Sequence, residues 1–199
     1  MGNYDKIILD FCGGTGEWSR EYRLHAYQVI IVTLPYYDIL TYKLPTRHIY
    51  GILAAPPCDD FAGSGARWWP EKDASGRTAH SLEIVSACLS LMAQCDDDLV
   101  FYSLENPVGR LRRLMPELGA PTLIFNPCDY GDPWTKKTCL WGKFNLPKVA
   151  PVEPVFYYTS TGARSNENWR KFWGANPETK IIRSITAPHF AKAFYEANK

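Results

Sequence analysis

The first half of the chain alternates short apolar runs with polar or amphipathic stretches. The apolar runs are rich in Ile, Val and Leu and are flanked by turn residues, which is typical of strands that a parallel sheet buries on both faces. They lie at residues 6–11, 29–32, 49–55 and 99–104. These four runs are the predicted strands of the first half.

One stretch between the runs has a clear helical period. Apolar side chains recur at helical spacing within residues 79–94, among them Leu82, Val85 and Leu89. A more polar helix is expected after the glycines that follow the first run, extending through residue 26. Strands that alternate with helices predict an α/β fold with a doubly wound, mostly parallel sheet, whose ligands bind at the carboxyl ends of the strands.

The second half is divided into short pieces by prolines. Residues 122–125 and 138–141 are predicted to pair as antiparallel strands. Residues 142–182 show no strong periodicity, and a closing helix is expected at residues 188–197 because Pro188 is tolerated in a first helical turn. We find no internal repeat and no low-complexity linker, so residues 1–199 are predicted to form one domain.

Composition narrows the classes of function. The chain has 199 residues, of which 46% are hydrophobic and 22% are charged, and its formal net charge is +1, so any contact with nucleic acid must come from local patches. The six cysteines form no C-x-x-C pair and have no nearby histidine at zinc-finger spacing, which disfavours a metal site and a disulfide framework and favours the reducing cytoplasm. Neither a secretion signal nor a membrane span is indicated.

A cysteine follows the third predicted strand in the sequence Ala55-Pro56-Pro57-Cys58. The two prolines end the strand, because neither can donate a hydrogen bond to a sheet and each fixes its own φ. Cys58 therefore lies on a stiff exit, which suits a nucleophile at the mouth of a parallel sheet. The alternative is a cysteine that serves only as a small buried apolar residue.

Glycines follow the first predicted strand in the sequence Asp10-Phe-Cys-Gly-Gly-Thr-Gly16. Because glycine has no side chain, a ligand can approach the backbone N–H groups of such a loop near the start of a helix. The loop lacks the G-x-G-x-x-G spacing of a dinucleotide site and the G-K-[ST] ending of a phosphate loop, which disfavours NAD and ATP. A simple turn is the alternative.

The sequence Glu105-Asn106-Pro107 follows the fourth predicted strand as Pro-Pro-Cys follows the third. In a parallel sheet both strands end at the same edge, so the Cys58 thiol and the Glu105 carboxyl are expected to face one cleft. A carboxylate at the end of an apolar strand either caps backbone N–H groups or binds a ligand, because burying it without a partner is costly.

These three segments resemble motifs of the DNA (cytosine-5) methyltransferases, which use S-adenosylmethionine. The segment from Asp10 to Gly16 resembles the first cofactor motif of that family, Pro56-Pro57-Cys58 its nucleophile motif, and Glu105-Asn106 its glutamate-asparagine motif. Further along, Tyr130-Gly-Asp-Pro133 with Lys136 resembles the Tyr-Gly-x-Pro segment, and residues 183–188 with the following helix resemble the closing motif that returns to the cofactor.

The order of the motifs agrees with the family throughout, and the resemblance spans residues 6–197 apart from 142–182. It implies a Rossmann-like S-adenosylmethionine-dependent methyltransferase fold. The chain also looks like the compact members of the family from bacteriophage genomes, which would place it in the cytoplasm of a host cell.

The resemblance implies C5-methylation of cytosine in DNA, with Cys58 and Glu105 as the catalytic residues. The Cys58 thiolate would add to carbon 6 of cytosine and make carbon 5 nucleophilic, while Glu105 would bind the exocyclic amine and N3. The implied cofactor-binding residues are Asp10, Phe11, Gly13, Gly14, Gly16, Thr33, Asp38, Pro56, Ser184 and Thr186. The implied substrate-binding residues are Pro57, Asn106, Arg110, Lys136, Arg164, Arg170 and Lys171.

The chain departs from the family pattern at several positions. Thr33 follows the second predicted strand, where the family has an acidic residue for the ribose of the cofactor, and Asp38 is expected to take the next role at the adenine. Lys136 and Thr138 stand where two arginines are usual, and a lysine lacks the planar guanidinium fork.

The largest departure is length, because residues 142–182 replace a whole target-recognition domain. This insert mixes basic and aromatic residues, which suits phosphate contact and base stacking. We therefore expect a monomer that binds DNA with a short sequence context. The open alternatives are a C5-methyltransferase for RNA or a free cytosine nucleotide, an inactive homologue that binds the cofactor or DNA, and transfer of a group other than methyl.

Overall fold

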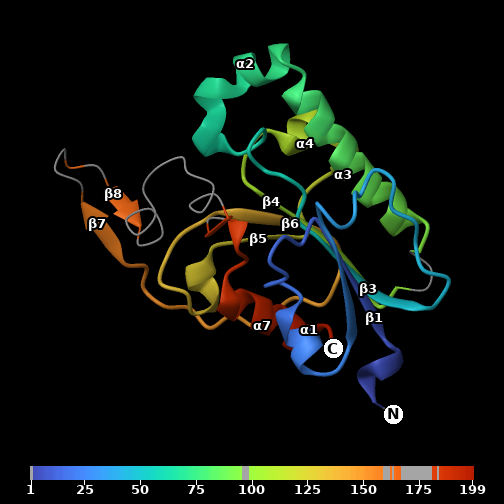
Figure 1. The fold of residues 1–199 in the computed structure, drawn as a ribbon. Coiled ribbons are helices and arrows are strands. Elements are labelled where there is room, and N and C mark those ends of the chain that lie inside the picture. Colours follow the sequence, from blue (N-terminus) through green and yellow to red (C-terminus); the bar gives the residue numbers. More distant parts are fainter. Residues whose placement is uncertain (1, 96–98, 159–161, 163, 167–180, 183) are drawn as a thin grey trace.

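The computed structural model describes residues 2–95, 99–158, 162, 164–166, 181–182 and 184–199. Among these residues six strands form one sheet in the order β2-β1-β3-β4-β6-β5 (Figure 1). The strands are β1 (Ile7–Phe11), β2 (Gln28–Val32), β3 (Ile49–Ala54), β4 (Phe101–Pro107), β5 (Leu123–Phe125) and β6 (Thr138–Lys143). The pairs β1–β2, β1–β3 and β3–β4 are parallel, whereas β6 runs antiparallel to both of its neighbours.

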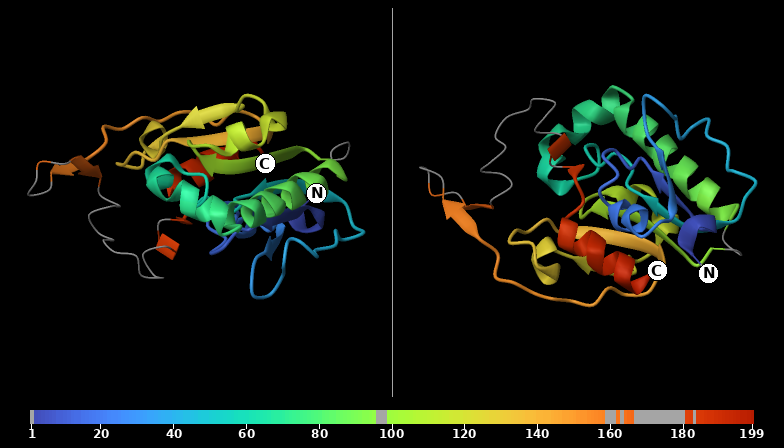
Figure 2. Two further views of the ribbon diagram at one scale, coloured as in Figure 1. Left: turned by 90° about the horizontal axis from the view of Figure 1, so that it is seen from above. Right: turned by 60° about the horizontal axis from the view of Figure 1, so that its bottom comes forward.

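Helices cover both faces of this sheet (Figures 1 and 2). They are α1 (Arg20–Leu24), α2 (Trp69–Ala74), α3 (Arg77–Ala93), α4 (Leu111–Leu114) and α7 (Pro188–Ala197). Short 3-10 turns add η1 (Asn3–Asp5), η2 (Gly63–Trp68), η4 (Pro116–Leu118) and η5 (Pro127–Tyr130). The predicted α/β fold with a doubly wound sheet is confirmed, although the sheet is mixed.

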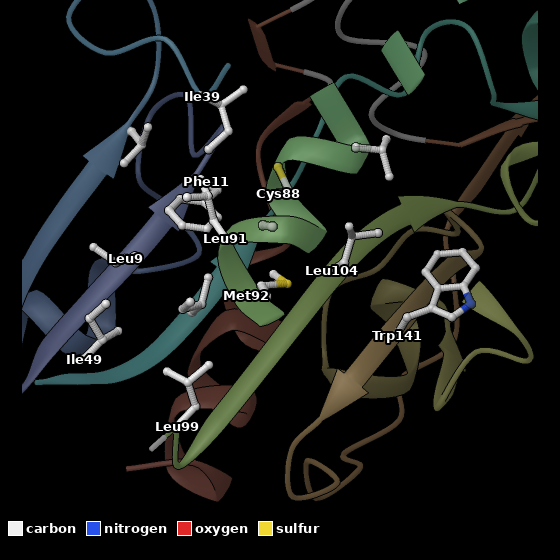
Figure 3. Packing of buried hydrophobic residues seen from close by; sticks show 14 of the residues in the cluster. Leu9, Phe11, Ile39, Ile49, Cys88, Leu91, Met92, Leu99, Leu104 and Trp141 are labelled. Carbon is white, nitrogen blue, oxygen red and sulfur yellow. The ribbon is translucent and has the colours of Figure 1, made fainter. Parts of the chain in front are cut away.

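The helix α3 packs on one face of the sheet. Successive side chains of a strand point to opposite faces, so Leu9 and Phe11 of β1 share the face that Cys88 and Leu91 of α3 cover (Figure 3). These side chains are buried, and each large apolar side chain removed from water in this way contributes about 1.5–3 kcal/mol. The apolar period predicted at residues 79–94 is therefore the core face of α3.

Aromatic rings pack α1 and α7 on the other face. Tyr22 of α1 stacks on Phe101 of β4 with ring centroids 5.5 Å apart, and Phe190 of α7 stacks on Phe125 of β5 at 3.9 Å. Phe194 of α7 contacts Phe101 edge-on at 5.7 Å. The closing helix is thus fixed to the sheet by rings, and it holds the preceding residues near the carboxyl ends of the strands.

Two elements differ from their predictions. The helix expected through residue 26 is only α1, which ends at Leu24, and Ala26 takes a positive φ of 65° that ends the helical geometry. The fourth strand continues through Pro107 instead of ending at residue 104, because β6 pairs with it antiparallel from Tyr102 to Pro107. Glu105 therefore lies inside β4 and not after it.

The antiparallel pairing of β5 with β6 is confirmed, with Leu123 opposite Leu140 and Phe125 opposite Thr138. The chain beyond Lys143 forms a further hairpin from β7 (Phe156–Tyr158) and β8 (Arg164–Asn166), which had no periodic signal in the sequence. This hairpin projects away from the main sheet (Figure 2).

The strand order places a switch point between β1 and β3. The chain goes from β1 to β2 on one side and then crosses to β3 on the other, so the connections leave the carboxyl ends of β1 and β3 in opposite directions. In open α/β sheets ligands bind in the crevice at such a point. The topology therefore indicates one place for a ligand before any side chain is considered.

Candidate functional site

A hollow opens at the carboxyl ends of β1 and β3. It is lined by Asp10, Cys12, Gly13, Gly14, Thr15, Glu17, Trp18, Ala55, Ser184 and Thr186. Five of these residues were predicted to bind a cofactor, namely Asp10, Gly13, Gly14, Ser184 and Thr186. The structure thus brings the glycine loop and the segment before α7 together around one space, although they lie near opposite ends of the chain.

Asp10 is the buried acidic group of this hollow. The hydroxyl of Ser19 donates a hydrogen bond to Asp10 Oδ2 at 2.5 Å, whereas the buried Oδ1 has no hydrogen-bond partner. Burial raises the pKa of Asp10 to about 6, against the opposing effects of the Ser19 hydrogen bond and the Arg23 charge. The carboxyl group therefore offers a free acceptor to a ligand that carries positive charge or an N–H group.

Gly13 lies directly against this carboxyl group. A Cβ at this position would collide with the Cγ and both oxygens of Asp10. Only glycine allows the backbone of the loop to approach the buried carboxyl so closely. The backbone of the loop and the Asp10 carboxyl consequently form one polar wall of the hollow.

The sequence-based prediction missed five residues of the lining, which are Cys12, Thr15, Glu17, Trp18 and Ala55. Trp18 is the largest of them. Its ring packs edge-on against Phe194 of α7 at 5.5 Å, and its buried Nε1 has no hydrogen-bond partner. The signal that could have identified it is an aromatic residue two positions after the last glycine of the loop.

Phe11 and Gly16 were predicted to contact the cofactor but do not line the hollow. The side chain of Phe11 is buried in the core beneath α3, where it meets Tyr42 edge-on at 6.1 Å. The alternation of β1 explains this placement, since neighbouring residues of a strand point to opposite faces and Asp10 faces the hollow. Gly16 is buried against the side chain of Ile31.

Thr33, Asp38 and Pro56 also lie outside the lining of the hollow. The carbonyl of Thr33 accepts hydrogen bonds from the N–H groups of Tyr36 and Tyr37 in the turn after β2. Asp38 is exposed, and its carboxylate accepts the N–H of Leu40 at 3.0 Å. Pro56 is buried beside Asn106. Their predicted cofactor contacts remain predictions.

A second group of side chains gathers at the ends of β3 and β4. The register of these parallel strands pairs Ala54 with Leu104, so Glu105 lies beside the turn that leads to Cys58. Burial raises the pKa of Cys58 to about 11, the Lys136 charge lowers it, and the charges of Glu105 and Asp59 raise it further. The free site therefore holds a thiol and not a thiolate at neutral pH.

Glu105 shares Lys136 with this thiol. Burial raises the pKa of Glu105 above its ordinary value, and the charge of Lys136 opposes the shift. Cys58, Glu105 and Lys136 thus interact electrostatically as one cluster. The cluster combines a nucleophile, a carboxyl group that retains a proton more readily than usual, and one positive charge.

Asn106 and Pro57 were predicted to bind the substrate. Asn106 is fully buried, and its Nδ2 donates a hydrogen bond to the carbonyl of Pro56 at 3.3 Å, while its Oδ1 has no hydrogen-bond partner. Pro57 is exposed on the turn itself. Asn106 therefore ties the proline turn to β4, which places the thiol next to Glu105.

Arg110 has a different place from the predicted one. It is 4% exposed, and its guanidinium group donates hydrogen bonds to Asp73, Thr78 and the carbonyl of Asp60. In the structure the hydrogen bonds of this guanidinium group are therefore made within the protein. The predicted substrate contact of Arg110 stays a prediction, and sequence alone could not show that this basic side chain turns inward to an acidic partner.

The remaining predicted substrate contacts fall in the insert. Arg164 begins β8, where its backbone pairs with that of Tyr158. Arg170 and Lys171 lie outside the described residues. Their predicted contacts with DNA remain predictions.

Metal ligands and membrane spans were sought in the described part of the chain. No three side chains of His, Cys, Asp or Glu there come together as a set of metal ligands. No helix of that part is long and apolar enough to cross a membrane.

Comparison with known proteins adds no assignment to this geometry. No family model matches the chain, and the search of curated proteins finds no match either. The function must therefore be argued from the hollow and the thiol cluster themselves.

Proposed function

We propose that the protein transfers a methyl group from S-adenosylmethionine to carbon 5 of cytosine in DNA, through a covalent bond between Cys58 and carbon 6 of the base. One observation carries the proposal: the hollow and the thiol cluster are neighbours at the carboxyl edge of the sheet. Ala55 lines the hollow, and Cys58 follows it on the same proline turn. A cofactor in the hollow and a base at the thiol would therefore adjoin.

The hollow has the donors and acceptors that suit S-adenosylmethionine. The free Oδ1 of Asp10 is matched to a ligand with positive charge, and the glycine loop presents backbone N–H groups. Ser184 and Thr186 add hydroxyl groups from the opposite wall. When bound there, this cofactor would supply an electrophilic methyl group on a sulfonium.

Cys58 is the proposed nucleophile. Its sulfur forms a bond to carbon 6 of cytosine after the thiol proton is lost to solvent, and the electron pair of the ring then reaches carbon 5. Carbon 5 would take the methyl group from the sulfonium, which would leave as the neutral thioether S-adenosylhomocysteine. Loss of the carbon 5 proton to solvent would then return the electron pair to the bond between carbon 5 and carbon 6 and release the Cys58 sulfur as a thiolate. Because the pKa of the Cys58 thiol is about 11 without substrate, the bound cytosine and the charge of Lys136 must favour the thiolate during catalysis.

Glu105 is the proposed recognition group for the base. A carboxyl group with a raised pKa can hold a proton and donate it to N3, while its other oxygen accepts the exocyclic amine of cytosine. Uracil presents the opposite pattern at both positions. A carboxyl group that keeps its proton would therefore favour cytosine as the substrate.

Mass analysis of nucleosides tests the proposal. DNA, RNA and dCMP are incubated separately with the protein and S-adenosylmethionine. The parent is compared with Cys58→Ala and with the matched control Cys95→Ala, which lies in the turn after α3. We expect 5-methylcytosine in DNA from the parent and the control only, and a covalent complex with DNA that contains 5-fluorocytosine. Methylation by Cys58→Ala would overturn the proposal. So would 5-methylcytosine that forms in RNA or from dCMP but not in DNA.

A further inference from the structure

The segment immediately after Cys58 comprises residues 59–76 and includes η2 and α2. We call this segment the arm. Its first turn is closed by the carbonyl of Cys58, which accepts the N–H groups of Phe61 and Ala62 at 3.0 and 2.9 Å. The position of the thiol along the chain is therefore coupled to the position of the arm.

Backbone hydrogen bonds attach the base of the arm to the segment that follows β4. The N–H of Arg110 donates to the carbonyl of Phe61 at 2.9 Å, and the N–H of Gly63 donates to the carbonyl of Val108 at 3.3 Å. Gly109 lies where the segment after β4 passes the base of the arm, and any Cβ at this position would collide with the carbonyl of Phe61. Only glycine permits this close approach, so the attachment is built into the backbone.

The side chain of Arg110 then reaches both ends of the arm. Its Nε donates to the carbonyl of Asp60 at 2.9 Å, and its two terminal nitrogens donate to the two carboxylate oxygens of Asp73 at 2.8 and 2.7 Å. The group also lies over the ring of Trp69, 4.7 Å from the centroid. Such a two-pronged pair fixes orientation as well as distance.

Asp60 provides a second anchor beside the thiol. Its carboxylate accepts the hydroxyl of Ser81 at 2.7 Å and lies 3.4 and 3.3 Å from the charged nitrogens of Lys72 and Arg77. Lys72 also donates to the carbonyl of Asp59 at 2.5 Å. The two ends of the arm are thus held together by paired charges.

These contacts fix the chain on both sides of Cys58 to β4, which carries Glu105, and to the segment that follows it. Before the thiol, Asn106 holds the carbonyl of Pro56, and after it Arg110 holds Phe61 and Asp60. We infer that Arg110 is a positioning residue that, through Asp73 and the arm, sets the place of the Cys58 thiol relative to the Glu105 carboxyl. The inference rests on the proposed function of these two groups.

The salt bridge between Arg110 and Asp73, which we call the clamp, can be removed at Asp73 without creating a cavity in the hydrophobic core. The side chain of Asp73 is 51% exposed, so Asp73→Ala removes the salt bridge and leaves no apolar cavity. Glu71→Ala is the matched control, since it removes the same charge from an exposed position of the same helix. Asp73→Glu keeps the carboxylate and is expected to restore part of the effect.

The test measures the thiol directly and the reaction separately. Alkylation of Cys58 by iodoacetamide is followed by peptide mass spectrometry as a function of pH, because this readout needs no methyl transfer. We expect alkylation of Asp73→Ala to be at least about 5-fold faster than that of the parent near neutral pH, since a released arm admits water and lowers the pKa of the thiol. Glu71→Ala should behave like the parent.

Methylation kinetics are the second part of the test. We expect kcat of Asp73→Ala to fall by about 10-fold or more with KM for S-adenosylmethionine unchanged, because the hollow is not part of the clamp. Unchanged alkylation and kcat in Asp73→Ala, together with a weaker salt dependence of DNA binding in Arg110→Gln, which removes the charge, would overturn the inference and make Arg110 a phosphate contact.

The two proposals fail in different ways. If the parent methylates nothing but alkylation of Cys58 still responds to Asp73→Ala, the proposed function fails and the positioning role of Arg110 stands. If methylation is found but neither readout responds to Asp73→Ala, the positioning role fails alone. Thermal melting of each variant shows whether the fold is retained, and Asp73→Glu decides between loss of the clamp and loss of the fold.

Discussion

The loop after β1 and the arm after β3 leave the same edge of the sheet. They differ in how their buried and charged side chains are paired. The loop contains glycines and leaves buried polar atoms of Asp10 and Trp18 without hydrogen-bond partners. In the arm, Asp60 Oδ1 and Trp69 Nε1 also lack hydrogen-bond partners, but the Asp60 and Asp73 carboxylates form salt bridges with basic side chains. The two regions therefore differ in their carboxyl groups: Asp10 has a hydrogen bond from Ser19 and one oxygen without a partner, whereas the carboxylates of the arm are ion-paired, which is the difference that the two proposals use.

Carboxyl groups show the same contrast. Burial raises the pKa of Asp10 and of Glu105, which face the hollow and the thiol. The hydrogen bonds from Arg110 and Thr78 instead lower the pKa of Asp73 to about 2. A carboxyl with a raised pKa gains from a new partner, whereas a carboxyl that is already paired does not.

The largest effect is expected where the thiol cluster meets the substrate. Glu105→Gln should reduce the methylation rate by about 100-fold or more, because an amide can hydrogen-bond to N3 and to the exocyclic amine but has no acidic proton to transfer to N3 when the thiolate adds to the ring. Binding of S-adenosylmethionine, measured by calorimetry on the same preparation, should not change. A variant that mainly unfolds would instead make Glu105 a structural cap.

The next effect separates the two regions. Gly13→Ala should weaken binding of S-adenosylmethionine by about 10-fold or more, since the new Cβ would displace the Asp10 carboxyl. Alkylation of Cys58 should stay at the rate of the parent. Gly65→Ala in the arm is the control, because its Cβ would make only ordinary contacts. Equal loss of cofactor binding in both variants would contradict the division into two regions.

The pH dependence of stability should report the buried Asp10. Its pKa is about 6 in the folded protein and 3.8 in the reference state, so the folded state binds more protons between these values. Stability from this group therefore falls as pH rises through that window, by about 2–3 kcal/mol at most. Urea denaturation of the parent and of Asp10→Asn checks this, and the variant should lack that part of the slope.

The same shift predicts how cofactor binding depends on pH. A positively charged ligand favours ionised Asp10, so affinity for S-adenosylmethionine should increase as pH rises through about 6. Asp10→Asn should remove this increase. An affinity of the parent that is independent of pH would show that the carboxyl does not face the ligand.

The smallest effect concerns Lys136. Its positive charge lowers the pKa of the Cys58 thiol, so Lys136→Ala should raise that pKa further and slow alkylation of Cys58 at alkaline pH by a few-fold. Lys136→Arg keeps the charge and should behave like the parent. Faster alkylation in Lys136→Ala would show that the lysine mainly shields the thiol from the reagent.

Local pattern in the sequence was enough for most elements of the main sheet and for the edge where the candidate site lies, although it missed the β7–β8 hairpin. Apolar runs define β1 to β4, and the carboxyl ends of parallel strands meet at one edge, so the glycine loop, Cys58 and Glu105 could be placed near one another without a structure. The closing helix was predicted from its proline start in the same way. These features depend on residues that are close in sequence or on a general rule of topology.

Only the tertiary structure decided which side chains face the site and which hold it together. Phe11 turns into the core while its neighbour Asp10 faces the hollow, and Glu105 lies inside β4 because β6 pairs with it. Arg110 became a clamp because Asp73, from a separate helix, comes within 2.7 Å of it. Each outcome depends on a partner that is distant in sequence, and a linear pattern contains no information on where such partners meet.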